Sequence, residues 1–411
     1  MIRHGLSTLA LAALATASGA ASAECGIERG SVSILSNDFP ALHAVAARAE
    51  ECASGGVTVN KNQTTEHKQL QVPALTVNPS EYTVAVVANN SIVPLLNEDL
   101  VRPLDDLVEQ YGEGLRENQL IRIGGNIMAI AFMANSQHLF YREDLLEEAG
   151  LEVPTSYEDV LAAAGTLREK GLIQTPLAAA DQPGWHLAAE FVNMYLGHGG
   201  EFFEPGSAEV AIQNEKGIAT LETMKAMTGF MDSAYLTFDS NELRPYWESS
   251  RVALMNAWGS QAAAYVDLEG DSPETAEHTR FAAAPTVGGG DVPAAALWWD
   301  GFTIARNVAD EDAEASFRAM MHALSPELLE EHAEDAVWLI EGYEPTPVAA
   351  GVFATIEAGA KPYPMLPYMG LLHTALGDNL VEYLQGSESA EKALADVANA
   401  YTASAREAGF L

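Results

Sequence analysis

Three short apolar runs early in the chain each end in polar residues and lead into a helical pattern. They cover residues 31–36, 82–88 and 126–134. After the first run, Asn37 and Asp38 can cap a helix, and Pro40 suits its first turn. Strands that alternate with helices in this way predict βαβ units around a mainly parallel sheet, and hence an α/β protein. Ligands of open α/β sheets collect beyond the carboxyl ends of the strands, so the polar residues after these runs are the first candidates for a binding site.

The middle and end of the chain are richer in helical patterns. Thr155 and Glu158 have the spacing of a capping box before a segment with one apolar face. Further helical patterns run over residues 215–231, 310–324 and 390–408. A chain of 411 residues is long enough for two sizeable cores.

The first 23 residues have the layout of a secretory signal peptide. A positive start at Arg3 precedes an apolar stretch to about Ala17, and small residues precede Glu24. The apolar stretch is too short to span a membrane. A membrane anchor is the alternative, and a lipoprotein is disfavoured because Glu24 separates Cys25 from the expected cut. We expect cleavage after Ala23 and a soluble protein exported to the periplasm.

Cys25 and Cys52 are the only two cysteines. In an oxidising compartment an isolated pair most simply forms one disulfide, which here would tie the start of the exported chain to the end of its first helix. Two free buried thiols are the alternative. No C-x-x-C spacing occurs, so the pair does not predict a redox or catalytic role.

Acidic residues dominate the charge of the chain. The 58 Asp and Glu residues against 21 Lys and Arg give a formal net charge of −37. Such a surface excludes nucleic acid and disfavours anionic lipid as a partner. The acids are spread along the chain, which is typical of a solvated surface.

Standard catalytic and cofactor signatures are missing from the sequence. It has no G-x-x-x-x-G-K-[ST] loop, no H-E-x-x-H helix and no G-x-S-x-G elbow. We therefore expect no enzyme, no cofactor and no metal site. A carbohydrate-active hydrolase stays as an alternative, because it needs only two carboxylates facing each other roughly 5 to 9 Å apart.

Polar and aromatic residues gather instead at the predicted strand ends. Indole faces stack on sugar rings, and amide and carboxylate groups exchange hydrogen bonds with hydroxyls. A single Asn or Asp after a strand is more often a turn former, so the prediction depends on several such segments together. The candidate ligand-binding residues are Asn37, Asp38, Asn89, Asn90, Asn135, Gln137, Trp185, Trp258, Gln261, Trp298, Trp299, Asp300 and Tyr343.

The chain resembles the extracellular solute-binding proteins of bacterial ABC importers, in the branch that binds maltodextrins and other sugars. The most specific stretch is residues 131–171, "AFMANSQHLFYREDLLEEAGLEVPTSYEDVLAAAGTLREKG", which is similar to the family's "YNKDLFEKAGL-P-TWDEL" segment. Residues 100–108 and 249–261 are also similar. The resemblance implies a periplasmic-binding-protein-like fold of two α/β lobes with a central ligand cleft and hinge strands that cross between them. It places lobe 1 at residues 24–134 and 295–330, and lobe 2 at residues 135–294 and 331–411.

The same resemblance implies a function and a set of partners. The protein would capture a small neutral polar solute, a sugar or a polyol, as a monomer, and deliver it to the permease and ATPase of an importer. Adjacent side chains of an extended strand point to opposite faces, so one of Trp298 and Trp299 would pack under the hinge while the other faces the ligand. The alternative ligand is a quaternary-ammonium osmolyte such as a betaine, because Trp and Tyr faces cage cations and Asp300 would assist.

Overall fold

A computed structural model describes residues 25–411 of the protein. The predicted signal peptide and its cut after Ala23 lie outside the described residues. Within residues 25–411, no helix combines the length and the apolar character needed to cross a membrane.

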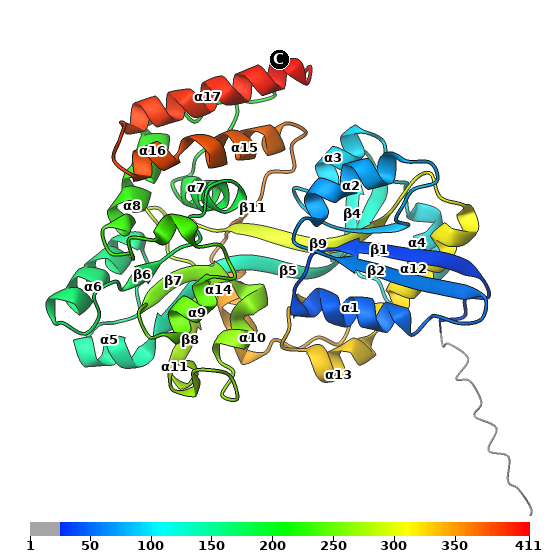
Figure 1. The fold of residues 1–411 in the computed structure, drawn as a ribbon, viewed down its shortest axis with the longest axis horizontal. Coiled ribbons are helices and arrows are strands. Elements are labelled where there is room, and N and C mark those ends of the chain that lie inside the picture. The colour runs from blue at the N-terminus through cyan, green and yellow to red at the C-terminus, as the bar shows by residue number, and fades with distance from the viewer. Residues whose placement is uncertain (1–24) are drawn as a thin grey trace, which may run out of the picture.

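Eleven strands form one sheet that runs through both halves of the molecule (Figure 1). Its main path has the strand order β2-β1-β3-β9-β5-β7-β6; β4, β8 and β10 also pair with β5, and β11 pairs with β9. The strands are β1 Gly30–Ser36, β2 Val57–Gln63, β3 Val84–Ala88, β4 Leu120–Ile123, β5 Asn126–Arg142, β6 Leu177–Ala178, β7 Leu254–Trp258, β8 Thr279–Ala282, β9 Ala296–Ile304, β10 Val337–Trp338 and β11 Lys361–Pro362.

The sheet is mixed, so the expectation of a mainly parallel sheet is wrong. The strands β2, β1 and β3 are parallel to one another, as the βαβ pattern predicts. From β3 onward, β9, β5 and β7 each run antiparallel to the preceding strand. The cause is the path of the chain: β5 leaves the first half of the molecule and β9 returns to it in the opposite direction.

The long strand β5 belongs to both halves. It has 17 residues; its first part pairs with β4 and β10 and its last part with β7 and β8, while β9 lies beside the middle. The predicted strand end at Ala134 is therefore wrong, because the strand continues for eight more residues to Arg142. The polar residues that follow Ala134 stay extended because they pair with β9 and β7. The chain passes from the first half to the second half once more, between β10 and α14 (Figure 1).

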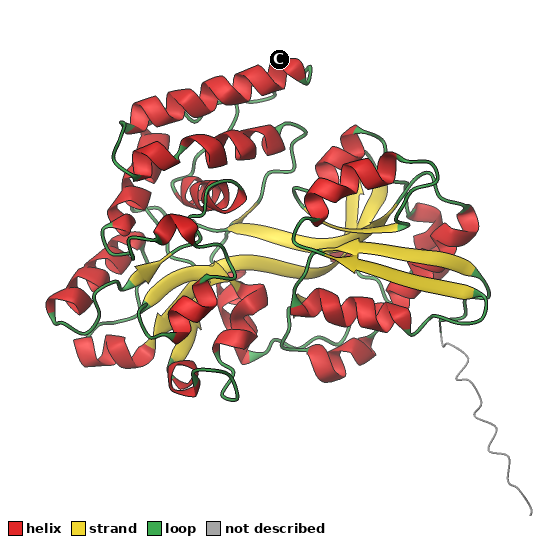
Figure 2. Ribbon diagram, in the orientation of Figure 1, coloured by secondary structure: helices red, strands yellow, loops and turns green. Residues whose placement is uncertain are grey.

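Helices surround the sheet in both halves (Figure 2). The helices α1 to α4, α12 and α13 lie at the right of Figure 1, and the others lie at the left. The helices are α1 Pro40–Glu50, α2 His67–Thr76, α3 Ile92–Asn97, α4 Asp105–Tyr111, α5 Glu143–Ala149, α6 Tyr157–Glu169, α7 Trp185–Gly197, α8 Glu215–Thr228, α9 Leu243–Glu248, α10 Ala262–Tyr265, α11 Pro273–Glu277, α12 Asp310–Ala323, α13 Leu329–His332, α14 Ala350–Glu357, α15 Met369–Asn379, α16 Val381–Leu384 and α17 Ala390–Glu407.

Each half has a hydrophobic core of its own. In the first half, Phe132 of β5, Phe302 of β9 and Phe317 of α12 are fully buried in one cluster. In the second half, Phe191 of α7 and Tyr401 of α17 are fully buried in another. Each half therefore buries its own apolar side chains in a cluster separate from the other. The lobe boundaries expected from the sequence stay a prediction.

Two of the expected helix caps differ from the structure. The cap of α6 lies one residue later than expected: Ser156 accepts a hydrogen bond from the Asp159 backbone N–H, and the Asp159 carboxylate accepts one from the Ser156 N–H. Before α1, Phe39 takes the cap position with no side-chain hydrogen bond, so capping by Asn37 or Asp38 is wrong. Pro40 does occupy the first turn.

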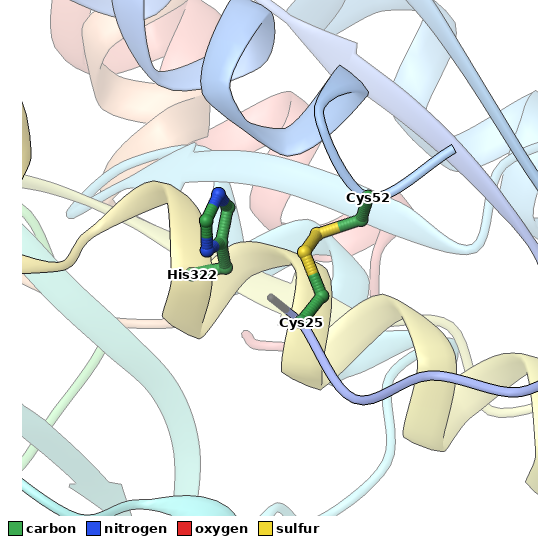
Figure 3. A group of neighbouring side chains, drawn as sticks. All are labelled: Cys25, Cys52 and His322. Carbon is green, nitrogen blue, oxygen red and sulfur yellow. A yellow bond between two sulfur atoms is a disulfide. The ribbon is translucent and has the colours of Figure 1, made fainter. Parts of the chain in front are cut away.

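Cys25 and Cys52 form the predicted disulfide, with 5.6 Å between their Cα atoms. It joins the first described residue to Cys52, the second residue after the end of α1, and His322 of α12 lies beside it (Figure 3). The His322 Nε2 atom lies 2.8 Å from a carboxylate oxygen of Glu51. The start of the described chain is thus linked both to α1 and, through this neighbour, to α12.

Candidate functional site

Three tryptophans, a tyrosine and a histidine from separate elements meet where β5 and β9 cross between the halves. We call Trp185, Trp258, Trp298, Tyr363 and His373 the aromatic group. The ring centroids of the three tryptophans lie 5.8 to 6.0 Å apart. Tyr363 lies 4.3 Å from Trp298, and His373 lies 5.5 Å from Trp185. These separations are typical of tilted and edge-to-face aromatic packing.

Local backbone geometry places Trp185 in this group. It is the first residue of α7 and follows Gly184, whose φ of 95° lies in the left-handed region that favours glycine. The chain at Gly184 also lies very close to α15. A Cβ on Gly377 would be 2.2 Å from the Gly184 carbonyl oxygen, so only glycine fits there.

The two adjacent tryptophans of β9 point to opposite sides, as strand geometry predicts. Trp298 is 7% exposed and packs into the aromatic group. Trp299 is half-buried and packs against the first-half cluster that includes Val87 and Met128. Trp298 is therefore the member of the pair that joins the candidate site.

Several of the predicted binding residues have a buried polar atom without a partner in the described chain. The indole N–H groups of Trp185 and Trp298 have no acceptor, and the side-chain oxygens of Asn90 and Gln261 have no donor. Burying a polar atom without a hydrogen bond costs about 1–3 kcal/mol. Unpaired donors and acceptors of this kind are chemically suited to a ligand that both accepts and donates hydrogen bonds.

Lys68 of α2 reaches the aromatic group from the other half. Its ammonium lies 4.3 Å from the centroid of the Trp185 ring. Burial lowers the pKa of Lys68 to about 8, and the negative charge of Asp300 opposes that shift. Burial raises the pKa of Asp300 to about 7, against the influence of Lys68. The site thus contains one basic and one acidic group, and the charge of each shifts the pKa of the other.

Three of the predicted binding residues use their side chains to hold the protein together. Asn89 donates to the carbonyl of Leu297 and accepts from the Trp299 N–H, which fixes the loop after β3 to β9. Asn135 donates to the Ser260 hydroxyl and accepts from the Ser260 N–H.

Gln137 is buried in the second half, away from solvent. It donates to the carboxylate of Glu190 and accepts from the side chain of Asn193. Gln261 donates to Asn241, which leaves only its oxygen unpaired.

The remaining predicted residues show no contact with the aromatic group. Asn37 accepts from the Asp38 N–H, and the exposed Asp38 carboxylate pairs with His43 at 2.6 Å. Tyr343, in the segment between β10 and α14, packs beside Val337 and Val352. A ligand role for these three residues stays a prediction.

Sequence reasoning missed Lys68, Tyr363 and His373. None of them directly follows a predicted strand, the feature that points to the other candidates. The Tyr363 hydroxyl lies 3.0 Å from His373 Nδ1, and His373 Nε2 lies 3.0 Å from the Trp185 carbonyl oxygen. The segment "KPYPMLPYMG" (361–370) carries an aromatic and proline-rich pattern that could have suggested Tyr363.

A second polar group lies inside the second half. Asp181 and Glu190 are buried and line a small cavity. Burial raises the pKa of Asp181 to about 7. Burial and the nearby charge of Asp181 raise the pKa of Glu190 to about 8. The other residues that line this cavity are Tyr157, Ala179, Met194, Met224, Met227 and Met231.

Comparisons with known proteins identify related chains. Residues 36–325 match the model of the family described as bacterial extracellular solute-binding protein. A probable ABC transporter-binding protein of Deinococcus radiodurans is 24% identical over 184 residues, which are 43% of this chain. The match spans only 42% of that relative's own length.

Solved structures with much lower sequence identity share the fold. Maltose-bound MalE3 of T. maritima has a TM-score of 0.78 at 17% identity, over 90% of this chain and 99% of that one. A solute-binding protein of Agrobacterium radiobacter in complex with ribitol has a TM-score of 0.77 at 18% identity, over 90% of this chain and 97% of that one. A solute-binding protein of Agrobacterium vitis with bound D-mannitol has a TM-score of 0.74 at 17% identity, over 93% of this chain and 99% of that one. These likenesses confirm the periplasmic-binding-protein-like α/β fold predicted from the sequence.

Proposed function

Because the chain belongs to the bacterial extracellular solute-binding proteins, we propose that it is the binding component of an ABC importer for a neutral polyhydroxylated solute, a sugar or a polyol. The solute would lie at the aromatic group between the two halves, and the halves would close on it by a hinge motion. The protein would then deliver the solute, without chemical change, to a membrane permease and its ATPase. We further propose export to the periplasm with cleavage after Ala23, and a monomeric state.

The observation that carries this proposal is the pair of unpaired indole N–H groups within the aromatic group, together with unpaired amide oxygens on the segments that follow β3 and β7. Trp185 and Trp298 offer N–H donors, while Asn90 and Gln261 offer oxygen acceptors. A hydroxyl both accepts and donates, so one polyol can satisfy both kinds of atom. The apolar face of a sugar ring can lie against an indole. The maltose, ribitol and D-mannitol named for the structural neighbours support the same ligand class.

The same atoms favour a sugar over a quaternary ammonium compound. A betaine has no hydrogen-bond donor, so it would leave the oxygens of Asn90 and Gln261 unpaired. Its cation would also meet the ammonium of Lys68, which already lies over the Trp185 ring. Like charges in a partly desolvated site repel strongly.

Thermal unfolding against a panel of solutes tests the proposal. The protein from Glu24 onward is heated with sugars, polyols, betaines or amino acids. Each solute is present at a concentration about one hundred times the dissociation constant that the experiment is meant to detect. A solute that binds only the folded state adds ~2.7 kcal/mol to its stability under that condition, and raises the midpoint. We expect a shift with a sugar or polyol. A shift with betaines alone, or with no solute in the panel, would count against the proposed ligand class.

Replacing Trp185 with Ala should weaken binding of the solute found in that panel by about tenfold or more, the loss typical of a central aromatic contact. Trp185 is half-buried and begins a helix, so Ala is tolerated there. Isothermal titration calorimetry measures the affinity.

Trp299→Ala is the matched control, because Trp299 lies on the opposite side of β9. It should lower the free energy of unfolding in urea while changing affinity much less than Trp185→Ala does. The proposed position of the solute is wrong if Trp299→Ala is the variant that loses affinity.

A further inference from the structure

We propose that Lys68 is an internal ligand of the aromatic group: it holds the two halves together when no solute is bound, and an incoming solute must displace it. The first part concerns this chain alone. The second part rests on the proposed function, because it assumes that the solute uses the same indole face.

The contact joins the halves outside the hinge strands. Lys68 belongs to α2 of the first half, and Trp185 begins α7 of the second half. Another contact of this kind is the hydrogen bond from the Asn97 side chain to the Pro367 carbonyl, at 3.2 Å. Such contacts stabilise one relative position of the halves, because hinge motion of the crossing strands would break them.

Lys68 has little else to hold it in place. Among the residues described, its ammonium has no hydrogen-bond acceptor and no carboxylate within ion-pair distance, and its pKa responds to only one nearby charge, that of Asp300. A lysine in this setting gains mainly from the face of the indole. A stem of four methylenes could instead extend into water, so its place over Trp185 indicates that the ring attracts the ammonium.

The charges that face Lys68 are compatible with this role. His67 on its own helix, His186 on α7 and His373 on α15 all have a lowered pKa, mainly because they are buried. They are therefore neutral near pH 7 and do not repel the ammonium. Asp300 on β9 supplies the opposing charge.

A polyhydroxylated solute is a suitable competitor for this position. It can lie against the Trp185 ring and give the displaced ammonium new hydroxyl acceptors, since a lysine has three donors and no acceptor. A cation cannot do this. Lys68 therefore makes the site selective against quaternary ammonium compounds as well as occupying it.

Lys68→Met tests the proposal, because methionine keeps an unbranched apolar stem and removes the charge. We compare the radius of gyration of solute-free protein by small-angle X-ray scattering for wild type, Lys68→Met and Lys68→Arg. We expect Lys68→Met to be more extended and Lys68→Arg, which keeps a cation for the ring, to resemble wild type. Lys61→Met, which removes an exposed lysine of the same half, is the control and should leave the radius unchanged.

The affinity of the same variants separates the two parts of the proposal. If solute displaces Lys68, the Lys68→Met protein binds the solute of the thermal panel roughly two- to thirty-fold tighter, the factor equivalent to a cation–π contact. An unchanged radius of gyration overturns the internal-ligand role. If Lys68→Met has a larger radius of gyration but binds the solute more weakly than wild type, the solute does not displace Lys68. The scattering experiment needs no solute. If no solute in the thermal panel binds, that result counts against the proposed function only, and the scattering experiment still tests the internal-ligand role of Lys68.

Discussion

Raising the pH from about 4 to 8 should lower the free energy of unfolding of wild type relative to that of a variant in which Asp181 is replaced by Asn and Glu190 by Gln. In the unfolded chain these acids have pKa values near 4. In the folded protein the pKa of Asp181 is about 7 and that of Glu190 about 8. Between these limits the two groups bind more protons in the folded state than in the unfolded state, so their contribution to stability falls as the pH rises.

The expected size of the effect is large. A shift of three pKa units is on the order of 4 kcal/mol for one carboxyl group, and the two groups titrate as a coupled pair. Urea unfolding at several pH values measures it as the difference between wild type and the double variant. Glu169→Gln, which removes an exposed carboxylate on α6, should leave the pH dependence as in wild type. Parallel pH profiles for wild type and the double variant would contradict the burial argument.

Replacing both Cys25 and Cys52 with Ser should cost about 3.5 kcal/mol of stability. The disulfide closes a loop with a sequence separation of 27 residues, and the chain-entropy relation gives this value for a loop of that length. Both cysteines are buried members of the first-half cluster, and the two substitutions leave its large side chains in place. The free energy of unfolding in guanidinium, with and without reductant, measures the change.

The reductant provides the control for that experiment. Wild type in reductant should match the double Ser variant, and the variant itself should be insensitive to reductant. A variant as stable as oxidised wild type would mean that the folded state gains nothing from closing this loop.

Periodicity predicted the elements that are governed by local sequence. The helical patterns at 215–231, 310–324 and 390–408 correspond to α8, α12 and α17, whose ends differ by at most three residues. The strand predicted at 126–134 ends too early, because polar residues follow Ala134. Hydrogen bonding to β9 and β7 keeps that segment extended, and pairing with strands more than a hundred residues away is not encoded locally.

The site was predictable in its aromatic residues and much less so in its polar ones. Trp185, Trp258 and Trp298 were all chosen from the sequence and do come together. Asn89, Asn135 and Gln137 were chosen by the same rule, yet their amides hold loops and strands in place. An amide that fixes backbone and one that binds a solute have the same sequence signal, and only their hydrogen-bond partners distinguish them.

Lys68 shows a different limit of sequence reasoning. It lies on a helix in the first half, near no predicted strand end, and its contact is with a residue 117 positions later in the chain. Contacts between halves depend on how the crossing strands orient them. Such contacts become visible only when both halves are placed together.

The position of β9 has a consequence for how the protein is made. This strand fills the space between β3 and β5, although it is synthesised more than 150 residues after either of them begins. Until Ile304 has emerged from the ribosome, a nascent chain therefore has two open strand edges and an incomplete first core. Translation order alone therefore delays completion of the first half until most of the polypeptide has been made.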